Sequence, residues 1–191
     1  QKEVGLRVQA ETPVLGIVNR LSEQKGFVLI MQAMPTLLKM DLQIVVVGSG
    51  NKDYLKFFRD VAHKHPSKVC VYSPFTEKMA SRVYAGSDLY LMPSRYEPCG
   101  ISQLISLRYG SIPIVRSVGG LHDTIVNFDP FSDTGNGFAF EAYNKEELLV
   151  AIARATESYR HQHSWNKLVH RAMKQSFSWE LPARQYVDLY R

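Results

Sequence analysis

Hydrophobic and polar positions form alternating blocks along this chain. Short apolar runs of strand length are each followed by a stretch in which apolar residues recur at helical spacing. The apolar runs span 14–18, 43–47, 69–72, 89–92 and 112–115, and 137–140 is a candidate sixth. The helical stretches span 27–38, 54–65, 76–86, 101–109 and 119–125. This alternation predicts an α/β, Rossmann-like fold, a doubly wound parallel sheet with right-handed crossovers in which the first five runs pair.

The pattern becomes wholly helical toward the end of the chain. Asn144 is the predicted N-cap of a helix that carries Glu146 and Glu147 in its first turn. Two more helices are expected over 163–175 and 181–190, with no strand between them. We therefore expect one domain over 1–191, of which 144–191 is mostly helical.

Composition narrows the class of protein. The 191 residues can build one sizeable core, and 45% hydrophobic with 21% charged residues is ordinary for a globular domain. The net charge of +5 is scattered, which argues against a nucleic-acid partner and suits an anionic small ligand. No apolar run is long enough to span a membrane, and the polar start is not a signal peptide. These features predict a cytoplasmic protein, or one of the plastid stroma if it comes from a plant, with no membrane partner.

The two cysteines, Cys70 and Cys99, lie on different predicted elements without the spacing of a disulfide framework. We expect both to be free thiols. No group of Asp, Glu, His or Cys has the spacing of a metal site, so no metal is predicted.

The stretch 93–104 carries the most chemistry. It follows the apolar run 89–92 and places Glu97 at the carboxyl end of a parallel strand, where open α/β sheets bind their ligands. The amides of Gly100 and Ile101, which open the next helix, can grip hydroxyl groups together with this carboxylate. The alternative is an ordinary turn whose Glu complements the helix dipole.

Two other loops add cations and amides to the same sheet edge. Arg20 and Lys25 follow the first strand and suit a pyrophosphate, unless they belong to a plain solvated loop. Gly119 and Gly120 begin a helix and expose N–H groups to an anion, unless they form a simple turn.

A third glycine pair has a weaker signal. Gly48 and Gly50 follow the second strand, lack a third glycine and do not make a dinucleotide fingerprint, so we interpret them as a close-approach turn near the ligand. Together the loops after the strands predict a nucleotide diphosphate site with a carboxylate for a sugar.

Three motifs resemble the glycogen/starch synthase family. They are N-R-L-S-E-Q-K-G at 19–26, S-R-Y-E-P-C-G-I-S-Q-L at 94–104 and S-V-G-G-L-H-D-T at 117–124, and F-S-W at 177–179 resembles the family's C-terminus. Members of that family have two Rossmann-like domains, the GT-B fold, with the active site between them. The chain begins at Gln1 and lacks the Lys-x-Gly-Gly motif of the N-terminal acceptor domain. The resemblance therefore implies the C-terminal, donor-binding half alone.

The resemblance also implies roles for individual residues. Arg20 and Lys25 would hold the donor phosphates, and Glu97 would be the active-site carboxylate that contacts the glucose. Phe75 would lie near the adenine. The other implied donor contacts are Cys99, Gly100 and Ile101 against the sugar, and the amides of Gly119 and Gly120 against phosphate.

The implied reaction transfers glucose from ADP-glucose to the non-reducing end of an α-1,4-glucan with retention, and needs no metal or cofactor besides the donor. The acceptor would bind through the absent N-terminal domain, and the isolated domain is expected to be inactive. Whether Glu97 acts as a nucleophile or as an electrostatic group stays open, although the second role is favoured. The related glycosyltransferases often have a second glutamate eight positions later, where this chain has Ile105. The rival interpretations are a UDP-glucose-dependent enzyme similar to sucrose synthase, and a non-catalytic nucleotide-binding module.

Overall fold

A computed structural model describes residues 1–190 of the chain. Its strands form one parallel sheet in the order β3-β2-β1-β4-β5-β6. The strands are β1 (Val14–Val18), β2 (Gln43–Val47), β3 (Val69–Tyr72), β4 (Leu89–Met92), β5 (Ile112–Arg116) and β6 (Phe138–Phe140). The prediction of one parallel sheet is confirmed, and the candidate sixth run supplies the edge strand beside β5. β5 extends one residue beyond the predicted run and ends at Arg116.

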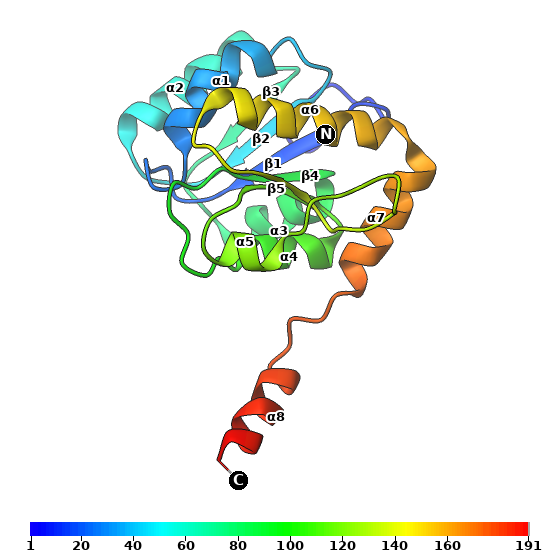
Figure 1. Cartoon of the computed structure of the whole chain (residues 1–191). Coiled ribbons are helices and arrows are strands. Elements are labelled where there is room, and N and C mark those ends of the chain that lie inside the picture. Colours follow the sequence, from blue (N-terminus) through cyan, green and yellow to red (C-terminus); the bar gives the residue numbers. More distant parts are fainter. Residues whose placement is uncertain (191) are drawn as a thin grey trace.

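Helices cover both faces of the sheet (Figure 1). One layer holds α1 (Phe27–Leu37), α2 (Lys52–Lys64) and α6 (Lys145–Arg160). The other holds α3 (Glu77–Gly86), α4 (Ser102–Tyr109) and α5 (Gly120–Thr124). α7 (Gln162–Lys174) packs against α4 and α6. The helices α1 to α5 each connect two parallel strands, as crossover connections do.

The N-terminus of α6 is fixed as its sequence predicts. The Asn144 side chain accepts a hydrogen bond from the Glu147 N–H at 2.9 Å. Glu147 reaches back, and its Oε2 accepts from the N–H groups of Glu141 and Ala142 at 2.9 and 2.7 Å. This reciprocal arrangement resembles a capping box and anchors the segment that follows β6 to the helix.

The strand order determines where a ligand can bind. The strands β1, β2 and β4 are buried on both faces, so their side chains form the core. The order reverses between β1 and β4, and at such a switch point the loops leave the carboxyl ends of the strands in opposite directions. The two loops that leave the sheet at this point are the β1–α1 loop, which carries Arg20 and Lys25, and the β4–α4 loop, which carries Glu97.

The last helix, α8 (Glu180–Leu189), stands apart from the body of the domain in Figure 1. Its apolar residues Tyr186 and Leu189, and Tyr190 beyond it, are 55, 75 and 84% exposed. Apolar side chains at this end of the chain are thus uncovered, and the side chain of Leu181 lies outside the described residues. Both cysteines are free, as predicted. Among residues 1–190 no helix has the length and apolar character to cross a membrane.

One carboxyl group inside the fold makes stability depend on pH. Asp88 precedes β4, and its Oδ2 accepts a hydrogen bond from the Val14 N–H at 2.8 Å, joining the starts of the two central strands. Burial raises the pKa of the Asp88 carboxyl, even though the bond from Val14 favours the ionised form. The folded chain therefore holds a proton here at a pH at which the unfolded chain has released it.

We predict that this group lowers stability as pH rises. The folded pKa of Asp88 is raised above its unfolded value, which is about 3.9 for an aspartate. The free energy of unfolding therefore decreases as pH rises from the unfolded pKa to the folded pKa. Asp88→Asn keeps an oxygen for Val14 and does not titrate. In urea denaturation between about pH 3 and 7, the stability of the wild type relative to Asp88→Asn should decline with pH. A difference that is constant or rises with pH would contradict this assignment.

Candidate functional site

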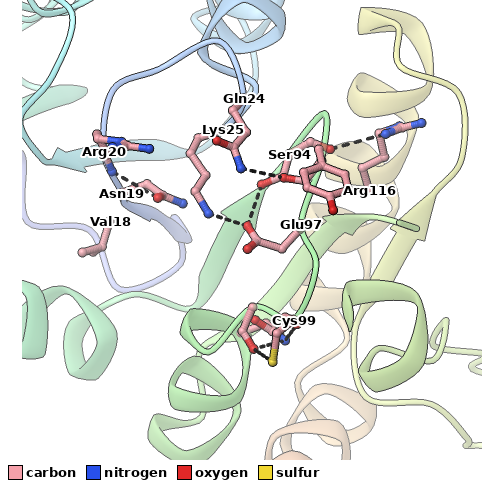
Figure 2. A network of polar contacts seen from close by, with 12 residues as sticks. Val18, Asn19, Arg20, Gln24, Lys25, Ser94, Glu97, Cys99 and Arg116 are labelled. Atoms are coloured by element: carbon pink, nitrogen blue, oxygen red, sulfur yellow. Dashed lines mark hydrogen bonds and ion pairs between the residues drawn. The ribbon is translucent and has the colours of Figure 1, made fainter. Parts of the chain in front are cut away.

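The two loops of the switch point meet through an ion pair. Lys25, in the β1–α1 loop, has its Nζ 2.5 Å from Oε2 of Glu97 in the β4–α4 loop. Glu97 is 6% exposed, and the fully buried Ser94 donates its hydroxyl to the same oxygen at 3.2 Å. A buried carboxylate requires such partners, and Figure 2 shows the Lys25 side chain directed at it. Two predicted site residues that are distant in sequence are therefore in direct contact.

Further contacts make these two loops one unit. The Arg95 N–H donates to the Gln24 carbonyl at 2.8 Å, and the Gln24 side chain donates to the Tyr96 carbonyl at 3.4 Å. On the surface, the Arg95 guanidinium pairs with Glu23 at 2.5 Å. The position of Glu97 is thus coupled to the loop that carries Lys25.

The turn between β5 and α5 supports the same loop. The Gly120 N–H donates to the carbonyls of Glu97 and Pro98 at 3.1 and 3.2 Å. A Cβ at position 120 would lie 1.9 Å from the Cys99 carbonyl oxygen, so only glycine permits this approach. Within residues 1–190 the Gly119 N–H has no hydrogen-bond partner. Of the two amides expected to face phosphate, that of Gly119 is available, whereas that of Gly120 holds the Glu97 loop.

The start of α4 presents more free donors. In the described part of the chain the N–H groups of Gly100 and Ile101 have no partner, and Ile101 and Cys99 are exposed. Gln103 stabilises this turn, because its buried side chain donates to the carbonyls of Cys99 and Gly100 at 3.3 and 3.0 Å. Sequence reasoning assigned no role to Gln103, although it lies inside the 94–104 motif three residues after a glycine.

The Gly48–Gly50 turn acts through its backbone. A Cβ on Gly48 would lie 2.0 Å from the Asn19 carbonyl oxygen, and Gly50 forms a parallel bridge with Leu21. These glycines bring the loop after β2 against the loop after β1. The close approach is as expected. Between these two glycines, Ser49 lines the cleft described below.

A cleft of about 750 Å³ opens beside the ion pair on the α3 and α4 side of the sheet. Its volume falls in the range of small-molecule sites. Arg20 and Phe75, both predicted site residues, line it together with Ile105. The remaining lining residues are Val18, Asn19, Ser49, Glu77, Ala80, Ser81, Tyr84, Ser102 and Tyr109. Lys25 and Glu97 lie outside this lining, so the structure separates the predicted site into a cleft and an adjoining carboxylate.

Tyrosines form part of the cleft and its support. The rings of Tyr84 and Tyr109 stack with their centroids 6.0 Å apart. The Tyr84 hydroxyl lies 3.1 Å from that of the buried Tyr90, which donates to the Val18 carbonyl at 2.8 Å. Burial raises the pKa of Tyr90 well above its usual value, so this hydroxyl stays protonated as a donor. Sequence reasoning missed Tyr84 and Tyr109, because their positions match ordinary helical packing.

The site suits a ligand with an anionic group, a flat apolar part and hydroxyls. The exposed Arg20, the Lys25 ammonium and the free Gly119 amide are donors for an anion. The cleft offers the exposed Phe75 ring, and the carboxylate of Glu97 with the α4 amides can bind hydroxyls. Among residues 1–190 no three His, Cys, Asp or Glu side chains gather closely enough to hold a metal ion.

Comparison with known proteins gives a consistent result. The family model described as "Glycosyl transferases group 1" matches residues 3–170. A glycogen synthase of Anaeromyxobacter dehalogenans is 49% identical over 191 residues, and one of Kosmotoga olearia is 47% identical. The chain spans 40% of the length of each of these relatives and matches their C-terminal portion.

Solved structures agree. The catalytic domain of starch synthase IV from Arabidopsis thaliana, bound to ADP and acarbose, superposes with a TM-score of 0.90 and 34% identity. The match covers 99% of this chain and 40% of that one. Sucrose-phosphate synthase from Thermosynechococcus elongatus shares the fold, with a TM-score of 0.72 at 21% identity over 96% of this chain and 46% of that one. The Rossmann-like half of a GT-B enzyme is thus the fold of this chain.

We predict that Gly120→Ala destabilises the site loop. The new methyl group collides with the Cys99 carbonyl, and overpacking of this kind costs about 1–3 kcal/mol. Gly86→Ala is the matched control, since a Cβ there meets nothing within 4 Å at the end of α3. The control should be neutral or up to about 1 kcal/mol more stable. Equal free energies of unfolding for the two variants would show that the turn tolerates a side chain.

Proposed function

This chain belongs to the glycosyl transferases group 1 family, and on that premise we propose that it is the donor-binding half of a glucan synthase. The complete enzyme would transfer glucose from ADP-glucose to the non-reducing end of an α-1,4-glucan with retention of the anomeric configuration. Its homology to glycogen synthases supports this substrate pair. The observation that carries the proposal is the Lys25–Glu97 ion pair beside the cleft at the switch point.

The donor fits this site in one orientation. The adenine enters the cleft against Phe75, whose N–H is fixed by the Ser49 hydroxyl at 3.0 Å. The diphosphate then passes Arg20 toward Lys25 and the Gly119 amide. This path delivers the glucose to Glu97 and to the free N–H groups of Gly100 and Ile101. The ADP held by the related starch synthase supports this choice of nucleotide.

Glucosyl transfer creates opposite charges that the site can stabilise. As the bond between the anomeric carbon and the phosphate oxygen breaks, negative charge grows on ADP and positive charge on the sugar. Arg20, Lys25 and the Gly119 amide would stabilise the departing diphosphate, while Glu97 would stabilise the sugar cation. The acceptor hydroxyl oxygen forms the new bond to the anomeric carbon, and its proton passes to the departing diphosphate, whose negative charge grows as the old bond breaks. Because Lys25 pairs with Glu97 in the free chain, the incoming diphosphate also competes for its ammonium.

The acceptor would bind to a second domain. The chain spans 40% of the length of its relatives, and α8 presents apolar surface that nothing in residues 1–190 buries. Domain closure then assembles the complete site. We expect residues 1–191 alone to bind the donor weakly and to form no glucan.

A titration of residues 1–191 with ADP, UDP and ADP-glucose tests the proposal directly. Binding of ADP and ADP-glucose in preference to UDP is the expected result. Preference for UDP would favour an enzyme that uses UDP-glucose, and absence of binding to all three would contradict the donor site. Labelled glucan formation by these residues alone would contradict the division of labour between two domains.

We predict that Arg20→Ala and Lys25→Ala each weaken ADP binding by about 1.5–3 kcal/mol, the range for hydrogen bonds to charged groups. Lys25→Arg should not restore full affinity, because a planar guanidinium does not replace a compact ammonium. Arg160→Ala, which removes an exposed cation paired with Glu157 on α6, is the charge-matched control. If calorimetry gives wild-type affinity for both alanine variants, these cations do not bind the donor.

We predict that Glu97→Gln strongly lowers turnover while leaving nucleotide binding little changed. The amide preserves volume and one acceptor but loses the charge that opposes the sugar cation. In an enzyme that contains the N-terminal portion found in relatives, turnover should fall by about a hundredfold or more, with ADP affinity little changed. Near-normal turnover, or a loss that only follows ADP affinity, would show that this carboxylate is not central to the chemistry.

A further inference from the structure

Arg116 contacts the Glu97 loop from the side opposite Lys25 (Figure 2). It is the last residue of β5, and its Nη1 donates to the carbonyls of Arg95 and Ser94 at 2.9 and 3.5 Å. In the described chain no backbone N–H donates to either carbonyl. Since Ser94 is fully buried, its carbonyl depends on this donor for a partner. The guanidinium thus satisfies backbone groups that the end of β4 leaves unpaired.

Arg116 is also anchored to the segment that follows β6. Arg116 Nε donates to the Glu141 carbonyl at 2.9 Å, and the guanidinium lies over the Tyr143 ring at 5.5 Å. The 141–142 segment is itself bound to the first turn of α6 by Glu147. A guanidinium is planar and can bridge separate acceptors, which a single ammonium does less well. Arg116 therefore links the Glu97 loop to a capped helix.

The contact reaches the carboxylate through Ser94. The Ser94 carbonyl accepts from Arg116, and the hydroxyl of the same residue donates to Glu97 Oε2 at 3.2 Å. Displacement of Ser94 would move a hydrogen-bond donor of the buried Glu97 carboxylate as well as its loop. Lys25 cannot replace the Ser94 hydroxyl as a partner of Glu97 during the reaction, because under the proposed function its ammonium binds the diphosphate.

We propose that Arg116 is a positioning residue for Glu97, which it holds at the reacting sugar during glucosyl transfer. This inference rests on the proposed function. It separates Arg116 from the phosphate-binding cations, because Nε and Nη1 of its guanidinium already donate to backbone carbonyls. Loss of Arg116 should therefore affect turnover more than donor binding.

The test compares Arg116→Ala and Arg116→Lys in an enzyme that joins this chain to the N-terminal portion of its relatives. A misplacement of about 1 Å can cost a hundredfold in rate, so turnover of Arg116→Ala should fall by about ten- to a hundredfold. KM for ADP-glucose should change by less than about threefold, and Arg116→Lys should recover activity only in part. Millimolar guanidinium should restore part of the turnover of Arg116→Ala, a response that a loss of folding would not give.

Two controls and the parent enzyme separate the outcomes. Tyr143→Phe keeps the ring under Arg116 and removes a hydroxyl that has no partner among the described residues, and Arg160→Ala removes an exposed charge on α6. Both should keep parental turnover. If Arg116→Ala fails to fold, the same kinetic measurements on Arg116→Lys test the inference instead. Normal turnover in the Arg116 variants, or a loss of turnover explained by weaker ADP binding, would overturn the role of Arg116 but leave the proposed function intact. A parent enzyme without glucosyl transfer would overturn both.

Discussion

The ion pair between Lys25 and Glu97 is the interaction on which the candidate site depends. It crosses the switch point of the sheet, at 2.5 Å, and gives a nearly buried carboxylate the counter-charge that burial demands. Three loops converge to hold it: the β1–α1 loop supplies the lysine, the β4–α4 loop supplies the glutamate, and the β5–α5 turn supports the glutamate through Gly120. The pair therefore joins the loop proposed to bind the diphosphate to the loop proposed to bind the sugar.

The sheet order explains why this pair lies next to a cleft. Between β1 and β4 the connections diverge to opposite faces, which leaves the space that α3 and α4 border on one side. Arg20 belongs to this cleft and Lys25 to the ion pair, although they are five positions apart on one loop. The proposed donor is elongated, with a flat base at one end and a sugar at the other, and so could span both parts. Under the proposed function, the two predicted cations would therefore contact different parts of the same donor.

Much of this arrangement could be predicted from the sequence, for physical reasons. Buried parallel strands are continuous apolar runs, so 14–18, 43–47 and 89–92 are clear strand signals. Glu97 lies in the loop after such a run, at the sheet edge where α/β folds commonly bind ligands. Contacts between distant residues could not be predicted in this way. The Gly120 amide bonds to the Glu97 loop, and Arg116 donates to the carbonyls of Ser94 and Arg95. Both interactions depend on how the loops pack in three dimensions. Tyr84 and Tyr109 were missed because a helical apolar pattern does not distinguish a cleft wall from a core.

A crystal structure of this chain with bound ADP would test the central claim most directly. The account predicts diphosphate oxygens within about 3.2 Å of Lys25 Nζ and the Arg20 guanidinium, with the adenine against Phe75. The Glu97 loop should keep its hydrogen bonds to Gly120 and Arg116 while Lys25 turns toward the phosphate. ADP bound away from the switch point, or a diphosphate that touches neither cation, would contradict the account.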